Sequence, residues 1–163
     1  MTRDLSAWIE QHAVSSPDRV AIRFEGTEIS YRALHVRIQK TAGLLHNTHG
    51  VRLGDRVAYL GFNTPECVIV FFACARLGAI YLPLNWRLAL PELDHVLGHA
   101  EPKLLITDSP HRESAVRLVN GRSGCVLIDH ANVVPVSKDS DIILAESNFG
   151  GDPDVPLLLV YTS

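Results

Sequence analysis

The chain has 163 residues, close to the usual size of one folded domain. Apolar residues make up 47% of it and charged residues 20%, a balance that disfavours disordered and fibrous architectures. The formal net charge is −3, from 15 basic and 18 acidic side chains, so the chain lacks the basic field that nucleic-acid binding needs.

The cysteines and the first residues indicate the compartment. Cys67, Cys74 and Cys125 are widely spaced and odd in number, which argues against a disulfide framework and fits a reducing compartment. Residues 1–20 contain no apolar core of a secretory signal. The longest uninterrupted apolar stretch, residues 67–75, is far too short for a membrane span. These features predict a cytoplasmic protein without a transmembrane segment.

The first fifty residues predict a helix, a hairpin and a second helix. Apolar residues recur at helical spacing over residues 4–15, and Trp8 fits this stripe and is expected in the core. Residues 20–29 alternate between apolar and polar types around a Glu-Gly turn, which predicts a short hairpin. Ser30 is a favourable N-cap for a helix over residues 31–47, whose apolar stripe should pack against the rest of the fold.

The pattern of apolar residues changes after residue 55. Short continuous apolar runs alternate with helical stretches, which is typical of parallel strands whose connecting helices cover both faces of a sheet. We expect strands at residues 56–61, 79–84, 103–107, 125–128 and 157–161. We expect helices at residues 65–77, 91–99, 111–119 and 140–147. The predicted fold class is therefore α/β, a mostly parallel sheet with helices on both faces, preceded by a helix and a small β-hairpin.

The predicted helix over residues 65–77 has the clearest boundaries. Thr64 is its N-cap, a proline occupies its first turn, and Gly78 supplies a left-handed exit. Because it is apolar nearly all round, we expect it to be buried against the sheet. Residues 148–156 are rich in Gly, Pro and Asp and are interpreted as a linker-like loop before the final strand. The whole chain, residues 1–163, is predicted to be a single unit.

Candidate ligand-binding positions lie where the parallel strands end, because ligands bind there in parallel α/β sheets. Such ends are visible at residues 61–64, 84–87, 107–109 and 161–163. The last one is unusual, since an apolar strand runs directly into Tyr161, Thr162 and Ser163. Hydroxyl groups and backbone amides at a strand exit can begin an anion-binding turn. The residues alone leave open whether this is such a turn or a strand that merely ends in polar residues.

A metal site and a reactive thiol are not expected. His95 and His99 lie four residues apart on a predicted helix, the spacing of a two-histidine metal face, but no third ligand accompanies them. The cysteines are interpreted as small buried hydrophobic residues. No Ser/His/Asp or Cys/His arrangement emerges from the spacing, so we assign no catalytic residue.

Four stretches, in order, carry a family resemblance. They are residues 29–34 (ISYRAL), residues 54–66 (GDRVA…NTPE), residues 75–85 (ARLGAIYLPLN), and residues 152–163, which end in LLVYTS. Together they resemble the N-terminal part of the adenylate-forming enzymes, the superfamily of acyl-CoA synthetases, peptide-synthetase adenylation domains and luciferases. The last stretch resembles the approach to the phosphate loop of this family, without the glycines and the lysine of that loop.

The resemblance implies an ATP-dependent ligase. A complete relative would activate a carboxylic acid with ATP and Mg²⁺ as an acyl-adenylate and then transfer the acyl group to the thiol of coenzyme A. Tyr161, Thr162 and Ser163 match the start of the loop that holds the phosphates of ATP. Arg87 matches a position where some acyl-CoA synthetases carry an arginine near the CoA phosphates. The alternative for Arg87 is an ordinary surface arginine.

Three interpretations of the chain follow. The first is the N-terminal part of an acyl-CoA synthetase for a fatty or aromatic acid, expected to be inactive alone because the rest of the phosphate loop and the later family elements are missing. The second is a standalone module that uses the same lobe to bind a partner or ligand. The third is a truncated reading frame without an independent role. The free edge of the last predicted strand also predicts self-association.

Overall fold

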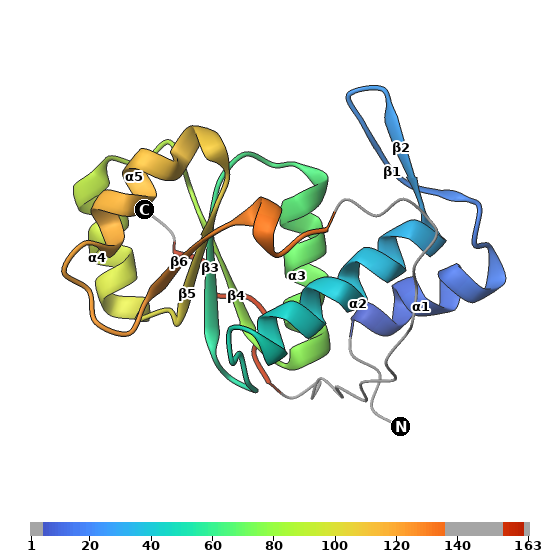
Figure 1. Cartoon of the computed structure of the whole chain (residues 1–163), viewed down its shortest axis with the longest axis horizontal. Coiled ribbons are helices and arrows are strands. Elements are labelled where there is room, and N and C mark those ends of the chain that lie inside the picture. The colour runs from blue at the N-terminus through green and yellow to red at the C-terminus, as the bar shows by residue number, and fades with distance from the viewer. Residues whose placement is uncertain (1–4, 136–154, 162–163) are drawn as a thin grey trace.

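A parallel sheet stands at the centre of the structure, a computed structural model that describes residues 5–135 and 155–161. The sheet has four strands in the order β4-β3-β5-β6, and each neighbouring pair is parallel. Helices cover both of its faces (Figure 1). The predicted α/β class is therefore confirmed. The strands are β3 (Arg56–Leu60), β4 (Ile80–Leu84), β5 (Leu104–Thr107) and β6 (Val126–Asp129).

Two helices pack on each face of the sheet. One face carries α2 (Tyr31–Asn47) and α3 (Pro65–Leu77), and the other carries α4 (Leu90–Ala100) and α5 (Arg112–Val119). Successive side chains of a strand point to opposite faces. Val57 of β3 accordingly lies in the cluster under α2 and α3, whereas the next residue, Ala58, lies in the cluster under α4 and α5. Burial on both faces explains why the strands are continuous apolar runs.

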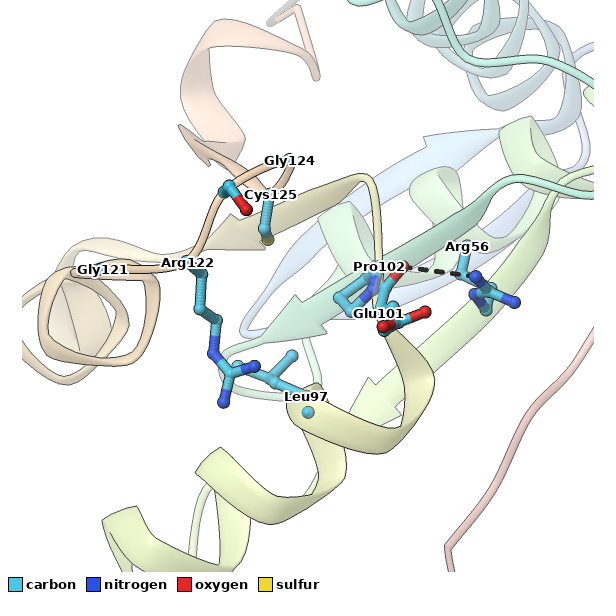
Figure 2. A pocket seen from close by; sticks show the side chains of 10 residues that line it. Arg56, Leu97, Glu101, Pro102, Gly121, Arg122, Gly124 and Cys125 are labelled. Carbon is cyan, nitrogen blue, oxygen red and sulfur yellow. Dashed lines mark hydrogen bonds between the residues drawn. The ribbon is translucent and has the colours of Figure 1, made fainter.

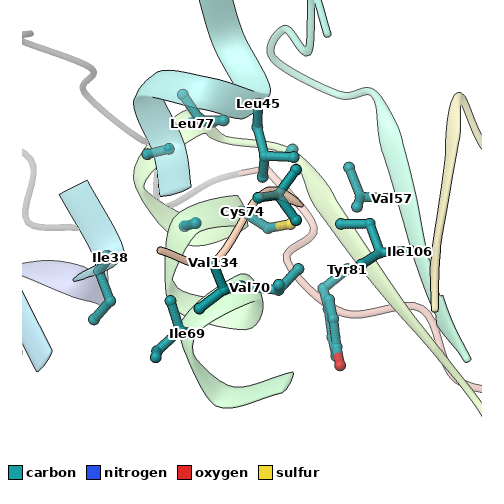
Figure 3. Close-up of a cluster of buried hydrophobic side chains, with 14 of the residues drawn as sticks. Ile38, Leu45, Val57, Ile69, Val70, Cys74, Leu77, Tyr81, Ile106 and Val134 are labelled. Carbon is teal, nitrogen blue, oxygen red and sulfur yellow. The ribbon is translucent and has the colours of Figure 1, made fainter. Parts of the chain in front are cut away.

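The larger cluster of buried side chains lies between the sheet and the α2–α3 layer (Figure 3). It joins residues of α2 and α3 with residues of all four strands of the sheet, among them Ile38, Leu45, Ile69, Val70, Cys74, Val57, Tyr81 and Ile106. The expectation that the helix over residues 65–77 is buried against the sheet is confirmed. Each large apolar side chain buried in this way stabilises the fold by about 1.5–3 kcal/mol before the entropy of ordering it.

The helix boundaries follow the predicted caps. The two helices of the α2–α3 layer have the bounds expected from the sequence, and those of the other layer differ by about one residue. Gly78 ends α3 in the left-handed conformation, at a φ of 65°. Thr64 is the N-cap residue of α3, but its hydroxyl accepts no hydrogen bond from the helix amides. The predicted helix at 140–147 lies outside the described residues, as does most of the loop at 148–156.

The residues before the sheet form a helix and a separate antiparallel hairpin, as predicted. These elements are α1 (Ser6–Ser15), β1 (Val20–Phe24) and β2 (Thr27–Ser30). The hydroxyl of Ser30 accepts a hydrogen bond from the Ala33 amide at 3.2 Å, so Ser30 caps α2 as expected. Within the described residues, none of the helices is both long enough and apolar enough to cross a bilayer.

The prediction that Trp8 lies in the core is wrong. Trp8 is 62% exposed. α1 contacts α2 and α3 along a narrow side that includes the buried Ser6 and the partly buried Ile9. Trp8 belongs to the apolar stripe of the sequence but lies outside this contact, because a short helix packed at the rim of a fold buries less of its circumference than the stripe covers.

The final predicted strand, residues 157–161, is shorter than expected. Leu158 forms one parallel bridge with Tyr81 of β4, through hydrogen bonds of 2.7 Å from the Tyr81 amide to the Leu157 carbonyl and of 3.0 Å from the Leu159 amide to the Tyr81 carbonyl. In a parallel ladder the next residue of β4 to bond on this side is Pro83. Proline has no amide hydrogen, so the ladder cannot continue in the regular way. The segment therefore borders β4 by a single bridge.

Candidate functional site at the carboxyl edge of the sheet

Rings that follow three of the parallel strands meet at one edge of the sheet. Phe62 follows β3, Trp86 follows β4, and His111 lies in η1 (Ser109–His111), a 3₁₀ turn after β5. The ring centroids are 5.1 Å apart for Phe62 and Trp86, 4.7 Å for Phe62 and His111, and 5.6 Å for Trp86 and His111. We call these three residues the aromatic cluster. Phe62 is 42% and Trp86 38% exposed, so the cluster faces solvent on one side.

A buried carboxylate stands behind this cluster. Asp108, which follows the last residue of β5, is only 4% exposed. Its Oδ2 accepts a hydrogen bond of 2.8 Å from the Phe62 amide. Its Oδ1 accepts a bond of 3.1 Å from the His111 amide and lies 2.5 Å from Nδ1 of the same residue. One side chain thus connects the loop after β3 with the turn after β5.

Arg87, one of the predicted site residues, lies beside the cluster. Its guanidinium carbon is 4.9 Å from the centroid of the Trp86 ring, a cation–π contact. Its backbone amide donates a hydrogen bond of 3.1 Å to Oδ1 of Asn85. The side chain is exposed, and within the described ranges no carboxylate forms an ion pair with it. Its N–H groups are therefore available to an anionic ligand, to which a guanidinium can donate two parallel bonds.

Tyr161, a second predicted site residue, lies at the same edge. Its hydroxyl is hydrogen-bonded to Nδ1 of His99, and its ring packs against the cluster under α4 and α5. It also borders a groove of about 530 Å³ whose other walls are Asn85, Leu88, Pro91, Glu92, His95 and Val96. Asn85 thus lines the groove and also holds the amide of Arg87. The other two predicted residues, Thr162 and Ser163, lie outside the described residues.

A second pocket, of about 460 Å³, lies at the opposite edge, near the start of β3 and β6 (Figure 2). Arg122 is engaged by several bonds, and Arg56 by one, while the buried Nε of Arg56 has no partner among the described residues. Arg56 donates to the carbonyl of Glu101 at 3.4 Å. Arg122 donates to the carbonyls of Leu118 at 2.9 Å and Asp94 at 2.7 Å, and it pairs with the Asp94 carboxylate at 2.5 Å. The Glu101 and Leu118 carbonyls lie at the C-terminal ends of α4 and α5, whereas Asp94 lies in the middle of α4. These bonds tie the two helices together, so we interpret this pocket as a structural junction.

The histidines and cysteines have structural surroundings. His99 is bonded to Tyr161, and His95 lines the groove. In residues 5–135 and 155–161, no group of three or more His, Cys, Asp or Glu side chains could hold a metal ion. Burial raises the pKa of all three cysteine thiols, which keeps them protonated. Cys74 is fully buried, as expected for a small hydrophobic residue, whereas the other two are half-buried.

Sequence reasoning identified the strand ends but missed the aromatic cluster and its carboxylate. Three successive strand ends carry Phe62, Trp86 and a histidine near Asp108, and this recurrence was the available signal. It indicates a cluster only once the strand order is known, because β3 lies between β4 and β5 and brings the three ends together.

Comparisons with known proteins identify the family. The model of the AMP-binding enzyme family matches residues 9–163. Over 98% of its length, the chain is 34% identical to indoleacetate–CoA ligase of Aromatoleum aromaticum. Over 72% of its length, it is 42% identical to feruloyl-CoA synthase of an Amycolatopsis species. The chain spans only 32% and 24% of the lengths of these two relatives.

A solved structure agrees with these matches. The O-succinylbenzoate coenzyme A synthetase of Bacillus subtilis, solved with ATP and a magnesium ion, is 27% identical to the chain. Its fold superposes with a TM-score of 0.67 over 82% of this chain and 35% of that one. With its parallel α/β sheet and a family match that runs over nearly all of its residues, the chain belongs to the AMP-binding enzyme family.

Proposed function

We propose that this chain is the N-terminal part of an ATP-dependent acid–thiol ligase, which activates a carboxylic acid as an acyl-adenylate and transfers the acyl group to coenzyme A. The observation that carries the proposal is the family match over residues 9–163, together with relatives that are named as CoA ligases. Both relatives quoted above are named for aromatic acids. An aromatic carboxylic acid is therefore the favoured substrate class, with a fatty acid as the alternative.

In this proposal the carboxyl edge of the sheet binds the anionic groups of the substrates. Tyr161, Thr162 and Ser163 begin the loop that contacts the phosphates of ATP. Arg87 contacts a phosphate of coenzyme A, which fits its exposed guanidinium, to which no carboxylate of the described residues is paired. The Trp86 ring supports one face of the guanidinium and leaves the N–H groups at its rim free to donate.

The described residues do not form a site for Mg²⁺ on their own. Residues 5–135 and 155–161 contain no group of three or more His, Cys, Asp or Glu side chains that could hold a metal ion. Mg²⁺ commonly keeps several waters and is held by substrate phosphates with one or two carboxylates. We therefore assign no residue of this chain to the ion and draw no step of the reaction through it.

The enzymatic proposal is tested by exchange of labelled pyrophosphate into ATP. The protein encoded by the open reading frame that contains these residues should catalyse exchange that depends on an added acid, and a panel of aromatic and fatty acids identifies the substrate. Residues 1–163 alone should give only background exchange. Acid-dependent exchange by residues 1–163 alone would contradict the second expectation, and its absence from the complete protein with every acid would contradict the first.

We also propose that residues 1–163 self-associate through the segment beside β4. Leu158 is 50% and Val160 56% exposed, and the segment has only one bridge to the sheet. Exposed apolar side chains on an edge with free backbone groups favour pairing with a second copy. Light scattering over a range of concentrations should show dimers or larger species, and a concentration-independent monomer mass would contradict this.

A further inference from the structure

We propose that Asp108 is a positioning residue for the anion contact of Arg87. Its carboxylate locks together the loop after β3 and the turn after β5, and so sets the aromatic cluster on which the Arg87 guanidinium lies. This inference rests on the proposed function of Arg87 as a phosphate contact. Asp108 itself touches no proposed substrate and acts through Phe62, His111 and Trp86.

The bonding of Asp108 points to this role. Both of its oxygens accept hydrogen bonds from loop groups, namely the amides of Phe62 and His111 and the ring of His111. In the part of the chain that the structure describes, no lysine or arginine forms an ion pair with this carboxylate. A buried carboxylate is costly unless its bonds are satisfied. Here its acceptors are used by groups of the two loops, the Phe62 amide and the amide and ring of His111, and so hold these loops in place.

The neighbouring backbone leaves room for this carboxylate. A Cβ atom at Gly61 would lie 2.9 Å from Oδ2 of Asp108 and 2.9 Å from Cε1 of Tyr59. Both separations are shorter than van der Waals contact, so any other residue would displace the carboxylate or the tyrosine ring. Gly61 does not have a positive φ, so its glycine is required by space rather than by backbone conformation. The Asp108 carboxylate is therefore closely packed against the backbone of Gly61 in addition to being hydrogen-bonded.

Two paths of contact lead from Asp108 to Trp86. One runs through the Phe62 backbone amide to the Phe62 ring, which meets Trp86 edge-on at 5.1 Å. The other runs through His111, whose ring lies 5.6 Å from that of Trp86. Trp86 in turn carries Arg87 at 4.9 Å. Loss of the carboxylate should therefore loosen the Trp86 ring and, with it, the guanidinium.

A second aspartate offers a matched control. Asp129 ends β6 and caps the 3₁₀ turn η2 (His130–Asn132) through the Ala131 amide at 2.9 Å, much as Asp108 caps η1. It pairs with Arg112 at 3.9 Å and has no bond to the aromatic cluster. Replacing Asp129 with Asn therefore removes a charge at the end of a neighbouring strand without releasing the loops around Trp86.

The test uses Trp86 as its own reporter, in a Trp8→Phe background that leaves a single tryptophan. Asp108→Asn replaces one carboxylate oxygen with an NH2 group. This group cannot accept a hydrogen bond from the backbone amide that it faces, so one of the two loops is released. We expect the acrylamide quenching constant of Trp86 to rise about twofold or more and the dissociation constant for coenzyme A to rise about tenfold. Asp129→Asn should change neither quantity. Unchanged quenching in a folded Asp108→Asn protein would overturn the proposal.

A second variant protects the test against misfolding. His111→Phe keeps a ring beside Phe62 and Trp86 but removes the Nδ1 contact to Asp108, and it should raise Trp86 quenching by a smaller factor. In the double variant with Asp108→Asn, the quenching constant of Trp86 should rise by less than the product of the two single increases, because both substitutions remove the same contact. If the increases of the two single variants simply multiply in the double variant, Asp108 does not act on Trp86 through His111.

The two proposals fail in different ways. If the unaltered chain does not bind coenzyme A, the role of Arg87 as a phosphate contact fails. The quenching of Trp86 in the Asp108 and His111 variants does not depend on that ligand, so it still decides whether Asp108 positions the cluster.

Discussion

The two edges of the central sheet carry similar residue types but use them differently. At the amino edge, Arg56 and Arg122 direct their N–H groups to backbone carbonyls and to Asp94. At the carboxyl edge, Arg87 rests on a tryptophan ring and has no carboxylate partner among the described residues, while Asp108 bonds two loop amides and the His111 ring rather than a lysine or arginine. A pocket lined by arginines is therefore weak support for a ligand site. What matters is whether the donors of those arginines are already bonded.

The largest effect is expected from truncating the buried carboxylate. Asp108→Ala leaves the Phe62 and His111 amides without their partner, and each unsatisfied buried group costs about 1–3 kcal/mol. We expect a loss of about 3 kcal/mol in the free energy of unfolding, measured by urea denaturation followed by circular dichroism. A loss below about 1 kcal/mol would mean that water replaces the carboxylate and that this edge is less rigid than inferred.

A substitution at the amino edge should change the stability of the fold but not the binding of coenzyme A. Arg122→Ala removes one hydrogen bond to the end of α5 and two to Asp94 in the middle of α4, which should lower the free energy of unfolding by about 1–2 kcal/mol in the same denaturation assay. Binding of coenzyme A, followed by titration calorimetry, should be unchanged. Weakened binding in a folded Arg122→Ala protein would show that this pocket is more than a structural junction.

Arg87 should give the opposite result. Arg87→Ala removes an exposed side chain that forms no ion pair within the described part of the chain, so the free energy of unfolding should change by less than about 0.5 kcal/mol. The dissociation constant for coenzyme A should rise about tenfold, because one charge-assisted contact is lost. Arg117→Ala removes an equal charge from the exposed, Glu113-paired surface of α5 and serves as the control. Equal weakening by both variants would indicate a general charge effect rather than a contact.

The smallest effect concerns the outer side of β4. Pro83→Val supplies an amide that can donate to the Leu159 carbonyl and extend the single bridge at Leu158. We expect slower hydrogen exchange of the Tyr161 amide and a gain of about 0.5–1 kcal/mol in the free energy of unfolding. Exchange at the original rate would show that the proline is not what limits this ladder.

Much of the fold could be predicted because its signals are local. The helix over residues 31–47 has its N-cap and apolar stripe in consecutive residues, and the four strands of the parallel sheet are recognisable as apolar runs. The prediction for Trp8 was wrong because the apolar stripe of a helix does not reveal how much of that stripe a neighbouring element covers. The short final strand could have been suspected from Pro83, but only its pairing partner reveals which amide is missing.

The amino-acid order by itself determined the class of the fold, the strand ends as candidate ligand positions, and the resemblance that the family match bears out. These follow from periodicity, caps and motifs, which are properties of neighbouring residues. Only the tertiary structure decided that Phe62, Trp86 and His111 form one cluster with Asp108 behind them. Their meeting depends on β3 lying between β4 and β5, and strand order is set by long-range packing rather than by any local pattern.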